Sequence, residues 1–505
     1  MLLRAKILDI EANGEYIVIL NQQDIEKIGF SETGRVTIQK GEKKVTAIYN
    51  ISKDLQTGII AVYRRVAEKL DLKEGDEVEV ESAPQPHSVE FIRRKIKGEK
   101  LTKEAALAIV RDAVDNKLTK PELAAFVTAL TTMGIDLDEA SYLTEAMVET
   151  GKKMVWPENE IVLDKHSIGG VPGDKTTMIV VPIVASLGYK IPKSSSRAIT
   201  NVAGTADRVE SIMPVDLSLE EAYEVVKKTN GCMVWGGNLD LAPADDIFIK
   251  IENPLKIDPL MLASIMAKKK AMGSKYVVID IPVGKEVKIK SVQDGEDLAR
   301  KFIELGKKLG MKVNALLTYG EQPIGHAIGP ALEAREALEV LTANRIEADL
   351  IDKATDLVAT VLEMVGVENA KQKALEALRS GKAGKKFREI IEAQGGDPNI
   401  KPEDIPVGKY TSVIEAKRDG FVILIRNSEL IKIGRMLGAP TYKGSGMVIH
   451  KKLGQKVKRN EPLLTLYSDN LNKLEKTLKY IEENEIEPVV IGDKLEMTLK
   501  KISYH

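Results

Sequence analysis

The chain reads Ile161-Val-Leu-Asp-Lys-His-Ser-Ile-Gly-Gly-Val-Pro-Gly-Asp174 where a short apolar run passes into a glycine-rich turn. A helix-like run follows and ends at Gly188, and Lys190-Ile-Pro-Lys193 then leads into a second polar turn. Strand–turn–helix units repeated this closely are typical of a largely parallel α/β sheet. We therefore predict an α/β domain over residues 161–345, with a buried strand at 276–281.

Different patterns flank this domain on both sides. Residues 1–84 alternate apolar and polar side chains in short runs between glycines, which indicates a small β-barrel-like domain. Helical spacing and capping residues over 88–160 predict the first part of a helical bundle. Residues 346–404 predict a helical connector, and 405–505 predict an α+β domain of hammerhead-like character. The fold class is therefore multidomain α/β, as expected for 505 residues.

The composition disfavours several classes of function. The 74 basic and 75 acidic side chains give a formal net charge of −1, so no overall field favours a nucleic-acid polymer or an anionic membrane. The single cysteine, Cys232, cannot form a disulfide within the chain, and no cysteine–histidine cluster offers zinc ligands. The N-terminal residues do not resemble a signal segment, and no apolar run is long enough to span a bilayer. We expect a cytoplasmic protein with no membrane partner and no bound metal.

The first turn carries groups that bind an oxyanion. Lys165 and the hydroxyl of Ser167 can donate to phosphate, while Gly169, Gly170 and Gly173 let backbone N–H groups approach it near a helix start. The pattern matches neither a Walker motif nor a dinucleotide-binding fingerprint, which disfavours ATP-driven chemistry and NAD binding. An ordinary solvated turn between strand and helix is the alternative interpretation.

A second turn has the same character and reads Ser194-Ser-Ser-Arg-Ala-Ile-Thr-Asn-Val-Ala-Gly-Thr-Ala-Asp-Arg-Val-Glu210. Ser195 and Thr205 offer hydroxyl donors, and Arg197 offers a second cation. A phosphate between the two turns would receive donors from both. Two such turns favour a phosphate site over the alternative of two solvated polar loops.

Together the two turns resemble the paired signature of the thymidine/pyrimidine-nucleoside phosphorylase family, over roughly residues 85–505. The resemblance implies that inorganic phosphate is bound by Lys165, Ser167, Thr177, Ser195 and Thr205, and that Thr205 also contacts AMP. Three departures mark a divergent branch. Pro172 is an extra residue in the first turn, Asn201-Val202 replaces a His-Thr pair, and an additional domain precedes the helices.

The helix that would recognise the base resembles the same family in part. Leu262-Ala-Ser-Ile-Met-Ala-Lys-Lys269 places Ser264 and Lys268 on one helical face, which implies a substrate contact and a base-pocket lysine. Upstream, Phe248-Ile-Lys-Ile-Glu252 lacks the arginine of the pyrimidine enzymes. Asp258 instead places a carboxyl just before the helix. This combination resembles the archaeal AMP phosphorylase branch of the family.

The resemblance implies phosphorolysis of nucleoside 5′-monophosphates, so that AMP and phosphate yield adenine and ribose 1,5-bisphosphate in nucleotide salvage or degradation. Asp258 is the candidate general acid that protonates the departing purine. Phosphate is a co-substrate, and no cofactor is implied. The expected partners are AMP or other nucleoside monophosphates, together with further copies of the chain in a homodimer or larger homo-oligomer. The predicted AMP contacts are Gly170, Ser196, Arg197, Ala198, Ile199, Thr200, Asn201, Thr205, Ser264 and Lys288.

Three alternative functions remain open at this point. A thymidine/pyrimidine-nucleoside phosphorylase is favoured by Ser264 and Lys268 but opposed by Asp258 and the missing arginine. A transferase resembling the anthranilate phosphoribosyltransferases would need magnesium and an Asp-Glu pair, for which the sequence shows no clear motif. A nucleotide-binding scaffold protein would use the two β-rich ends for assembly.

Overall fold

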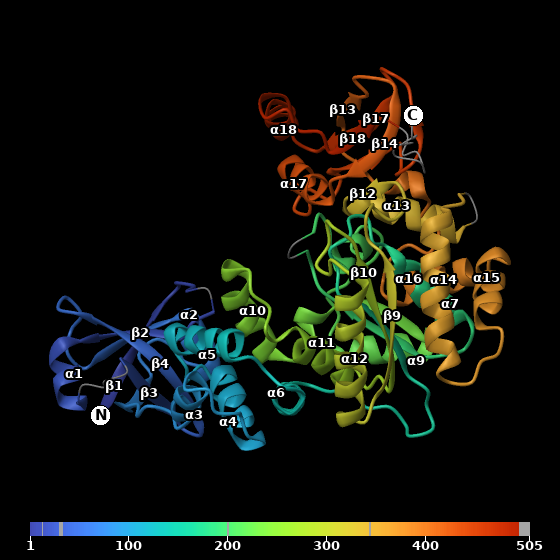
Figure 1. The fold of residues 1–505 in the computed structure, drawn as a ribbon. Helices are drawn as coiled ribbons and strands as arrows, with labels where there is room; N and C mark the ends of the chain where they lie inside the picture. Colours follow the sequence, from blue (N-terminus) through green and yellow to red (C-terminus); the bar gives the residue numbers. More distant parts are fainter. Residues whose placement is uncertain (13, 30–33, 199–200, 343–344, 494–505) are drawn as a thin grey trace, which may run out of the picture. The chain divides into compact units, whose positions relative to one another are not determined.

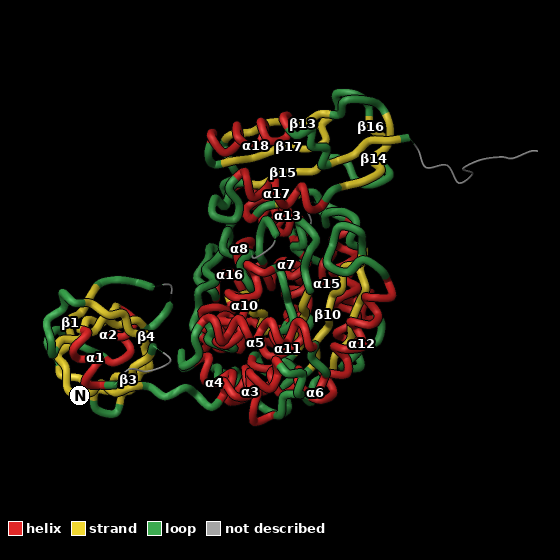
Figure 2. The backbone as a smooth tube through the Cα atoms, turned by 60° about the vertical axis from the view of Figure 1, so that its left-hand side comes forward, coloured by secondary structure: helices red, strands yellow, loops and turns green. Residues whose placement is uncertain are grey.

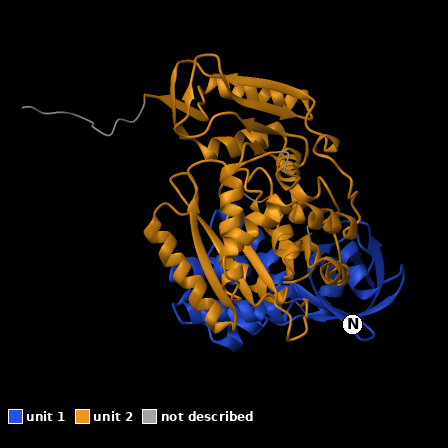
Figure 3. Cartoon of the chain, turned by 90° about the vertical axis from the view of Figure 1, so that its right-hand side faces the viewer, with its two compact units in different colours: residues 1–151, 242–264 blue, residues 152–241, 265–505 orange. Residues whose placement is uncertain are grey.

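The chain divides into two compact units in a computed structural model. Unit 1 comprises residues 1–151 and 242–264, and unit 2 comprises residues 152–241 and 265–505 (Figure 3). The structure describes residues 1–12, 14–29, 34–198, 201–342 and 345–493. Each unit thus combines segments that are distant in the sequence.

Unit 1 begins with a closed six-stranded barrel in the order β1-β5-β2-β4-β3-β6 (Figures 1 and 2). Its elements are β1 (Leu2–Leu8), β2 (Ile17–Asn21), α1 (Gln22–Ile28), β3 (Arg35–Lys40), β4 (Lys43–Ser52), β5 (Ile59–Tyr63), α2 (Arg64–Leu70) and β6 (Glu77–Ser82). Alternate side chains, among them Val18, Leu20 and Ile38, are fully buried inside it. The predicted small β domain is therefore confirmed, and closure leaves it without an unpaired strand edge.

Helices form the rest of unit 1: α3 (Ser88–Ile96), α4 (Lys103–Val114), α5 (Lys120–Met133), α6 (Leu137–Glu149) and α10 (Pro243–Leu255). Thr119 begins α5 with a capping box, as its spacing to a glutamate three residues later predicts. Lys95 of α3 and Glu139 of α6 form a buried ion pair at 2.6 Å. Arg35 of the barrel donates to Glu122 of α5 at 2.5 Å, so the barrel and the helical bundle share a polar contact.

Parallel strands form the centre of unit 2: β7 (Leu163–Ser167), β8 (Ile191–Ser195), β9 (Gly231–Trp235), β10 (Tyr276–Val283) and β11 (Lys312–Tyr319). β10 pairs with β7 on one side and β11 on the other, and β8 pairs with β9. An isolated parallel bridge between Val162 and Lys190 joins the starts of β7 and β8. The predicted parallel sheet and its buried strand at 276–281 are confirmed.

Helices pack around these strands: α7 (Thr176–Ser186), α8 (Thr205–Val209), α9 (Leu219–Thr229), α11 (Met261–Ala271), α12 (Val292–Lys308), α13 (Pro330–Leu341), α14 (Ala348–Glu363), α15 (Ala370–Arg379) and α16 (Lys382–Ala393), with 3-10 turns η1 (Gly236–Asn238) and η2 (Pro402–Asp404). Every residue of α7 is buried, because apolar side chains surround its whole circumference. It packs against α14 and α16 and anchors the hydrophobic core (Figure 1). The turn that leads into α7 is therefore fixed at its downstream end.

The C-terminal module, residues 405–493, mixes strands and helices as predicted: β13 (Tyr410–Glu415), β14 (Gly420–Ile425), α17 (Asn427–Leu437), β15 (Gly446–Ile449), β16 (Lys456–Val457), β17 (Pro462–Ser468), α18 (Leu471–Glu483) and β18 (Val489–Gly492). Its larger sheet has the order β12-β15-β17-β13, and β12 (Ala327–Ile328) comes from the α/β domain. The two parts of unit 2 are thus joined through one sheet.

Two further observations concern the whole described chain. Over the ranges given above, the helices fall short of the length and apolar character needed to cross a membrane. Cys232 is a free thiol buried in β9. Burial raises the pKa of this thiol to about 12, so it is protonated near neutral pH.

Candidate active site

The first predicted turn lies at the carboxyl end of β7 and leads directly into α7. Gly169, Gly170 and Gly173 have positive φ values of 80°, 99° and 72°. A Cβ on Gly173 would lie 2.8 Å from the carbonyl oxygen of Ile324 and 2.9 Å from that of Ala327. Glycine is therefore required at 173 by both the backbone conformation and the close packing.

Lys165 lies in β7, two residues before the strand ends, and is 2% exposed. Its Nζ donates to the Oγ1 of Thr176 at 2.9 Å and to that of Thr177 at 3.4 Å. The structure thus brings together two of the predicted phosphate ligands, Lys165 and Thr177, at the start of α7. Burial lowers the pKa of Lys165, although the negative charges of Asp174 and Asp280 oppose that effect.

Two carboxylates and a second lysine lie beneath the turn. Lys353 of α14 contacts Asp280 at 2.8 Å and Asp174 at 3.6 Å. Burial alone would raise the pKa of Asp174, but the nearby charges of Lys353 and Lys165 outweigh it and hold that pKa well below its usual range. Asp174 is therefore ionised, and its Oδ1 accepts a hydrogen bond from the Thr176 hydroxyl at 2.5 Å.

A group of buried cations lies along β7, β8 and α11. Lys269 contacts the carboxylate of Asp164 at 2.8 Å, and Lys193 lies 3.8 Å from it. Burial lowers the pKa of His166 far below its ordinary value, and the positive charges of the neighbouring lysines act in the same direction. Burial and the charge of Lys269 likewise lower the pKa of Lys193. The imidazole of His166 is therefore neutral, and an anion bound beside these lysines would favour their charged forms.

Sequence reasoning did not single out these cations. Lys193 occupies an interior strand position between apolar and small residues, and this is the one sequence signal that indicates a buried lysine. Lys269, Lys353 and the partner carboxylate Asp280 come from elements far along the chain, for which no local pattern exists.

The second predicted turn follows β8. The Oγ of Ser195 is buried and has no hydrogen-bond partner among the protein atoms that the structure describes. The N–H groups of Ala198 and Gly204 donate to Asp207 Oδ2 at 2.7 and 2.8 Å, which folds the turn back onto the start of α8 at Thr205. Ile199 and Thr200 lie outside the described residues.

Asn201 ties the second turn to the first. Its side-chain Nδ2 donates to the carbonyl oxygen of Val171 at 2.8 Å. The structure therefore places the two polar turns side by side, as a phosphate site between them requires. This contact involves Asn201, one of the positions where the sequence departs from the phosphorylase pattern.

Arg197 has a different environment from the one the sequence suggests. Its guanidinium donates twice to Glu210 at 2.8 Å and lies 3.3 Å from Asp216. It also stacks over the ring of Trp235, with 4.8 Å to the ring centroid. These hydrogen bonds raise the pKa of Arg197 and lower that of Glu210 to about 2. Arg197 is thus engaged in an ion-pair network that shapes the turn.

The remaining predicted contacts lie on three other segments. Gly170 lies beside the loop that precedes α12, since a Cβ on it would be 3.4 Å from the backbone nitrogen of Lys288. Lys288 is exposed in that loop. Ser264 and the half-buried Lys268 are one helical turn apart on α11. Asp258 is an exposed residue of unit 1, between α10 and α11.

A second buried network, also missed from the sequence, holds the first turn from behind. Lys175 is fully buried and donates to the carbonyl oxygens of Ile324 and Ala327 at 2.7 and 3.1 Å. It also forms an ion pair with Glu336 of α13. Burial alone would raise the pKa of Glu336, but Lys175 and its other donors lower it to about 2.

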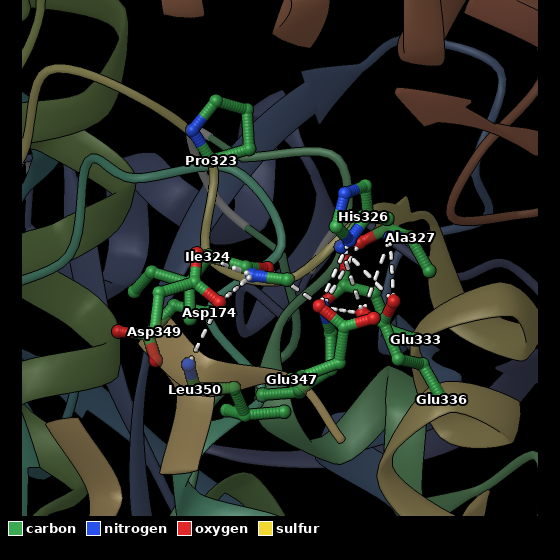
Figure 4. Close-up of polar contacts among 12 residues, drawn as sticks. Asp174, Pro323, Ile324, His326, Ala327, Glu333, Glu336, Glu347, Asp349 and Leu350 are labelled. Carbon is green, nitrogen blue, oxygen red and sulfur yellow. Dashed lines mark hydrogen bonds and ion pairs between the residues drawn. The ribbon is translucent and has the colours of Figure 1, made fainter. Parts of the chain in front are cut away.

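This network also contains a potential metal-ligand group. His326, Glu336 and Glu347 bring ligand atoms within 4.8 Å of one another, the single such group found in the described part of the chain (Figure 4). Both carboxylates already face cations: Glu336 faces Lys175 and Arg345, and Glu347 also contacts Arg345. The charges are balanced within the protein, so we interpret the group as an ion-pair network.

Comparisons with known proteins agree with this architecture. Residues 89–151 match the family model described as "Glycosyl transferase family, helical bundle domain", and residues 159–384 match "Glycosyl transferase family, a/b domain". Residues 421–486 match "Pyrimidine nucleoside phosphorylase C-terminal domain". The chain also resembles the anthranilate phosphoribosyltransferase of Thermus thermophilus in fold, with a TM-score of 0.51 and 16% identity over 60% of this chain and 98% of that one.

Much closer relatives cover the full length of the chain. The AMP phosphorylase of Thermofilum pendens is 49% identical over 100% of this chain and 98% of the relative. The AMP phosphorylase of Thermococcus kodakarensis is 49% identical over 94% of this chain and 95% of the relative. That of Pyrococcus furiosus is 47% identical over 97% of this chain and 97% of the relative. The similarity includes the N-terminal barrel and both polar turns. The chain therefore belongs to the AMP phosphorylase family, a branch of the thymidine/pyrimidine-nucleoside phosphorylases.

Proposed function

We propose that the chain cleaves AMP with inorganic phosphate and releases adenine and ribose 1,5-bisphosphate. The observation that carries this proposal is the full-length similarity to relatives named AMP phosphorylase, at 49% identity over 100% of the chain. The two adjoining polar turns support it, because phosphorolysis needs a site that binds an anionic nucleophile beside a sugar. The pyrimidine-nucleoside alternative is disfavoured by the same relatives.

We assign the nucleophilic phosphate to the space between the two turns. Its ligands would be Lys165, Ser167, Thr177 and Ser195. Lys165 is held by hydroxyls at the start of α7, where the positive end of a helix favours an anion. The buried oxygen of Ser195 is available to bond with phosphate. Positioning donors in a dry site stabilises the phosphate as it attacks the anomeric carbon.

The nucleotide would bind along the second turn and the segments next to it. We assign these contacts to Gly170, Ser196, Arg197, Ala198, Ile199, Thr200, Asn201, Thr205, Ser264 and Lys288, with Lys268 in the base pocket. Arg197 would contact the 5′-phosphate only by exchanging one of its carboxylate partners, Glu210 or Asp216. Its main contribution in this proposal is therefore to hold the turn through its bonds to Glu210 and Asp216.

Asp258 would act as general acid toward the departing base. A purine leaves a ribosyl group most easily when its imidazole ring nitrogen is protonated, and a positioned carboxylic acid supplies that proton. Asp258 is exposed just ahead of α11, the helix that carries Ser264 and Lys268. Phosphate would then attack the anomeric carbon while the acid protonates the departing base.

We further propose that phosphate is the co-substrate, that no cofactor takes part, and that the enzyme works in the cytoplasm as a homodimer or larger homo-oligomer. The buried lysines support phosphate as the co-substrate, because a bound anion would favour their charged forms. The buried thiol of Cys232 suits a reducing compartment. Light scattering of the purified protein tests the oligomeric state, and turnover in excess EDTA tests the need for a metal.

The direct test incubates the purified chain with AMP and phosphate and follows adenine and ribose 1,5-bisphosphate by chromatography. Asp258→Asn and Lys165→Ala should each lower turnover by at least roughly a hundredfold. Glu304→Gln is a matched control, because Glu304 is an exposed carboxylate of α12 that pairs with Lys307. Cleavage of thymidine with AMP inert would overturn the AMP assignment, and no turnover of either substrate would favour a nucleotide-binding role.

A further inference from the structure

The second turn is held from outside by the C-terminal module. Val202 is fully buried and belongs to the hydrophobic core of that module, together with Ile433 and Leu437 of α17. A Cβ on Gly434 would lie 2.7 Å from Val202 Cγ1, so the helix backbone approaches the turn as closely as a glycine permits. The turn therefore packs against α17 as an integral part of the module's core.

A polar contact accompanies this packing. The Nε and Nη2 of Arg435 on α17 donate to the main-chain oxygen of Asn201, at 3.2 and 3.0 Å. The side chain of the same Asn201 donates to the carbonyl oxygen of Val171 at 2.8 Å. A continuous set of hydrogen bonds thus runs from α17 through the second turn to the first.

The module also contacts the last residue of the second turn. Lys443 lies 2.8 Å from the carboxylate of Glu210, the same carboxylate that accepts two hydrogen bonds from Arg197. The turn is therefore held at two points by cations of the C-terminal module, Arg435 at Asn201 and Lys443 at Glu210. Two of the proposed AMP contacts, Asn201 and Thr205, lie at or between these points.

We propose that Arg435 is a positioning residue for the phosphorolysis reaction, and that it sets the spacing of the two anion-binding turns through Asn201. This inference rests on the proposed function, because the turns matter as a pair only if both hold substrate anions. It makes the C-terminal module part of the catalytic apparatus. Arg435 itself touches no substrate in this scheme and acts through the backbone of Asn201.

The expected effect is on substrate affinity. Without Arg435, the main-chain oxygen of Asn201 loses two hydrogen bonds and the turn is released. The hydrophobic core stays closed, because the Arg435 side chain is exposed. Arg435→Ala should therefore raise the KM for AMP and the Kd for inorganic phosphate roughly tenfold each, with a smaller change in kcat and an unchanged Tm. Arg435→Lys retains one donor and should restore part of the affinity.

The control is Lys432→Ala, which removes another exposed cation from the same helix. Lys432 lies over the ring of Tyr480 of α18, so its ammonium group is engaged within the C-terminal module. This variant should keep the KM, kcat and phosphate Kd of the wild type. Gly434→Ala provides a second perturbation, because its methyl group would displace Val202 and should raise the same two constants.

The experiment measures AMP turnover, Tm and the calorimetric Kd of inorganic phosphate for the full-length wild type and the four variants. Unchanged KM and phosphate Kd in Arg435→Ala would overturn the inference. A fall in kcat with KM unchanged would overturn it as well, because a smaller fraction of folded enzyme gives that result. If the wild type binds phosphate but does not cleave AMP, the proposed function fails. The phosphate Kd of Arg435→Ala still decides the role of Arg435 in that case.

Discussion

Replacing Lys175 by methionine should destabilise the loop behind the first turn, although the new side chain has a similar length. The ammonium group of Lys175 is fully buried and contacts Glu336 and the carbonyl oxygens of Ile324 and Ala327. In Lys175→Met, Glu336 would stay buried with Arg345 as its remaining cation, and two carbonyl oxygens would lose a donor.

The size of the stability loss in Lys175→Met follows from the pKa of Glu336. That pKa is lowered from 4.5 to about 2, which corresponds to stability on the order of 3 kcal/mol from all donors to this carboxylate. Breaking a buried ion pair by removing one partner typically costs about 3–5 kcal/mol. Because the folded-state pKa is depressed, this stability is fully present above pH 4.5 and is lost as the pH falls toward 2. We therefore expect a loss of about 3 kcal/mol near neutral pH.

Hydrogen exchange measures this loss locally, which matters because a chain of several domains does not unfold in one step. The backbone N–H groups of His326 and Ala327 donate to Glu336, so their exchange reports opening of the network. An opening free energy lower by about 3 kcal/mol accelerates their exchange by roughly a hundredfold.

The matched control is Lys371→Met. Lys371 also faces two carboxylates at 2.7 Å, those of Asp352 and Asp356, but its side chain is 44% exposed. Exposed ion pairs contribute at most about 1 kcal/mol, so exchange of the loop before α13 should stay unchanged. Exchange within a few-fold of the wild type in Lys175→Met would refute the argument that this buried pair holds the loop.

Three further predictions concern single groups. Burial lowers the pKa of Lys165, and its charged form would bind phosphate, so phosphate affinity should decline as the pH rises, before the ordinary lysine pKa of 10.5 is reached. A calorimetric Kd that does not change up to pH 10.5 would contradict this. Gly173→Ala should strongly weaken phosphate binding, because its Cβ would lie 2.8 Å from a carbonyl oxygen. Gly188 also has a positive φ, 94°, but a Cβ there would meet open space, so Gly188→Ala should lower Tm and leave the phosphate Kd unchanged. The thiol of Cys232, whose pKa burial raises to about 12, should react with a thiol reagent only after unfolding in urea, and rapid labelling of the native protein would show that β9 is accessible.

The parts of the site that could be predicted from the sequence are those whose functional side chains belong to neighbouring residues of one short segment. The family resemblance implies that Lys165 and Thr177 share a phosphate ligand, and the structure brings both side chains together because a strand, a glycine turn and a helix start follow one another directly. The sheet, the barrel and the helical bundle were predicted for the same reason, since hydrophobic periodicity and caps are local signals. The AMP-contact roles of the second turn stay predictions.

The parts that could not be predicted depend on partners far along the chain. Lys175 and Glu336 are 161 residues apart, and Arg435 meets Asn201 across 234 residues. Neither pair has a spacing that a sequence pattern could indicate. Arg197 shows the converse limit: an arginine in a polar turn is typical of an anion ligand, but Glu210 on the far side of a short helix occupies its guanidinium.

These long-range pairs explain how a turn rich in glycine can keep a defined geometry. Glycine lets the backbone adopt the required conformation but gives it no rigidity of its own. Lys175 behind the first turn and Arg435 against the second each add hydrogen bonds from a separate element, so the turns are held by the fold around them. Under the proposed assignments, specificity for the base would vary through Asp258 and Ser264 without disturbing the phosphate site, because the buried pairs Lys175–Glu336, Lys269–Asp164 and Lys353–Asp280 are formed by other residues.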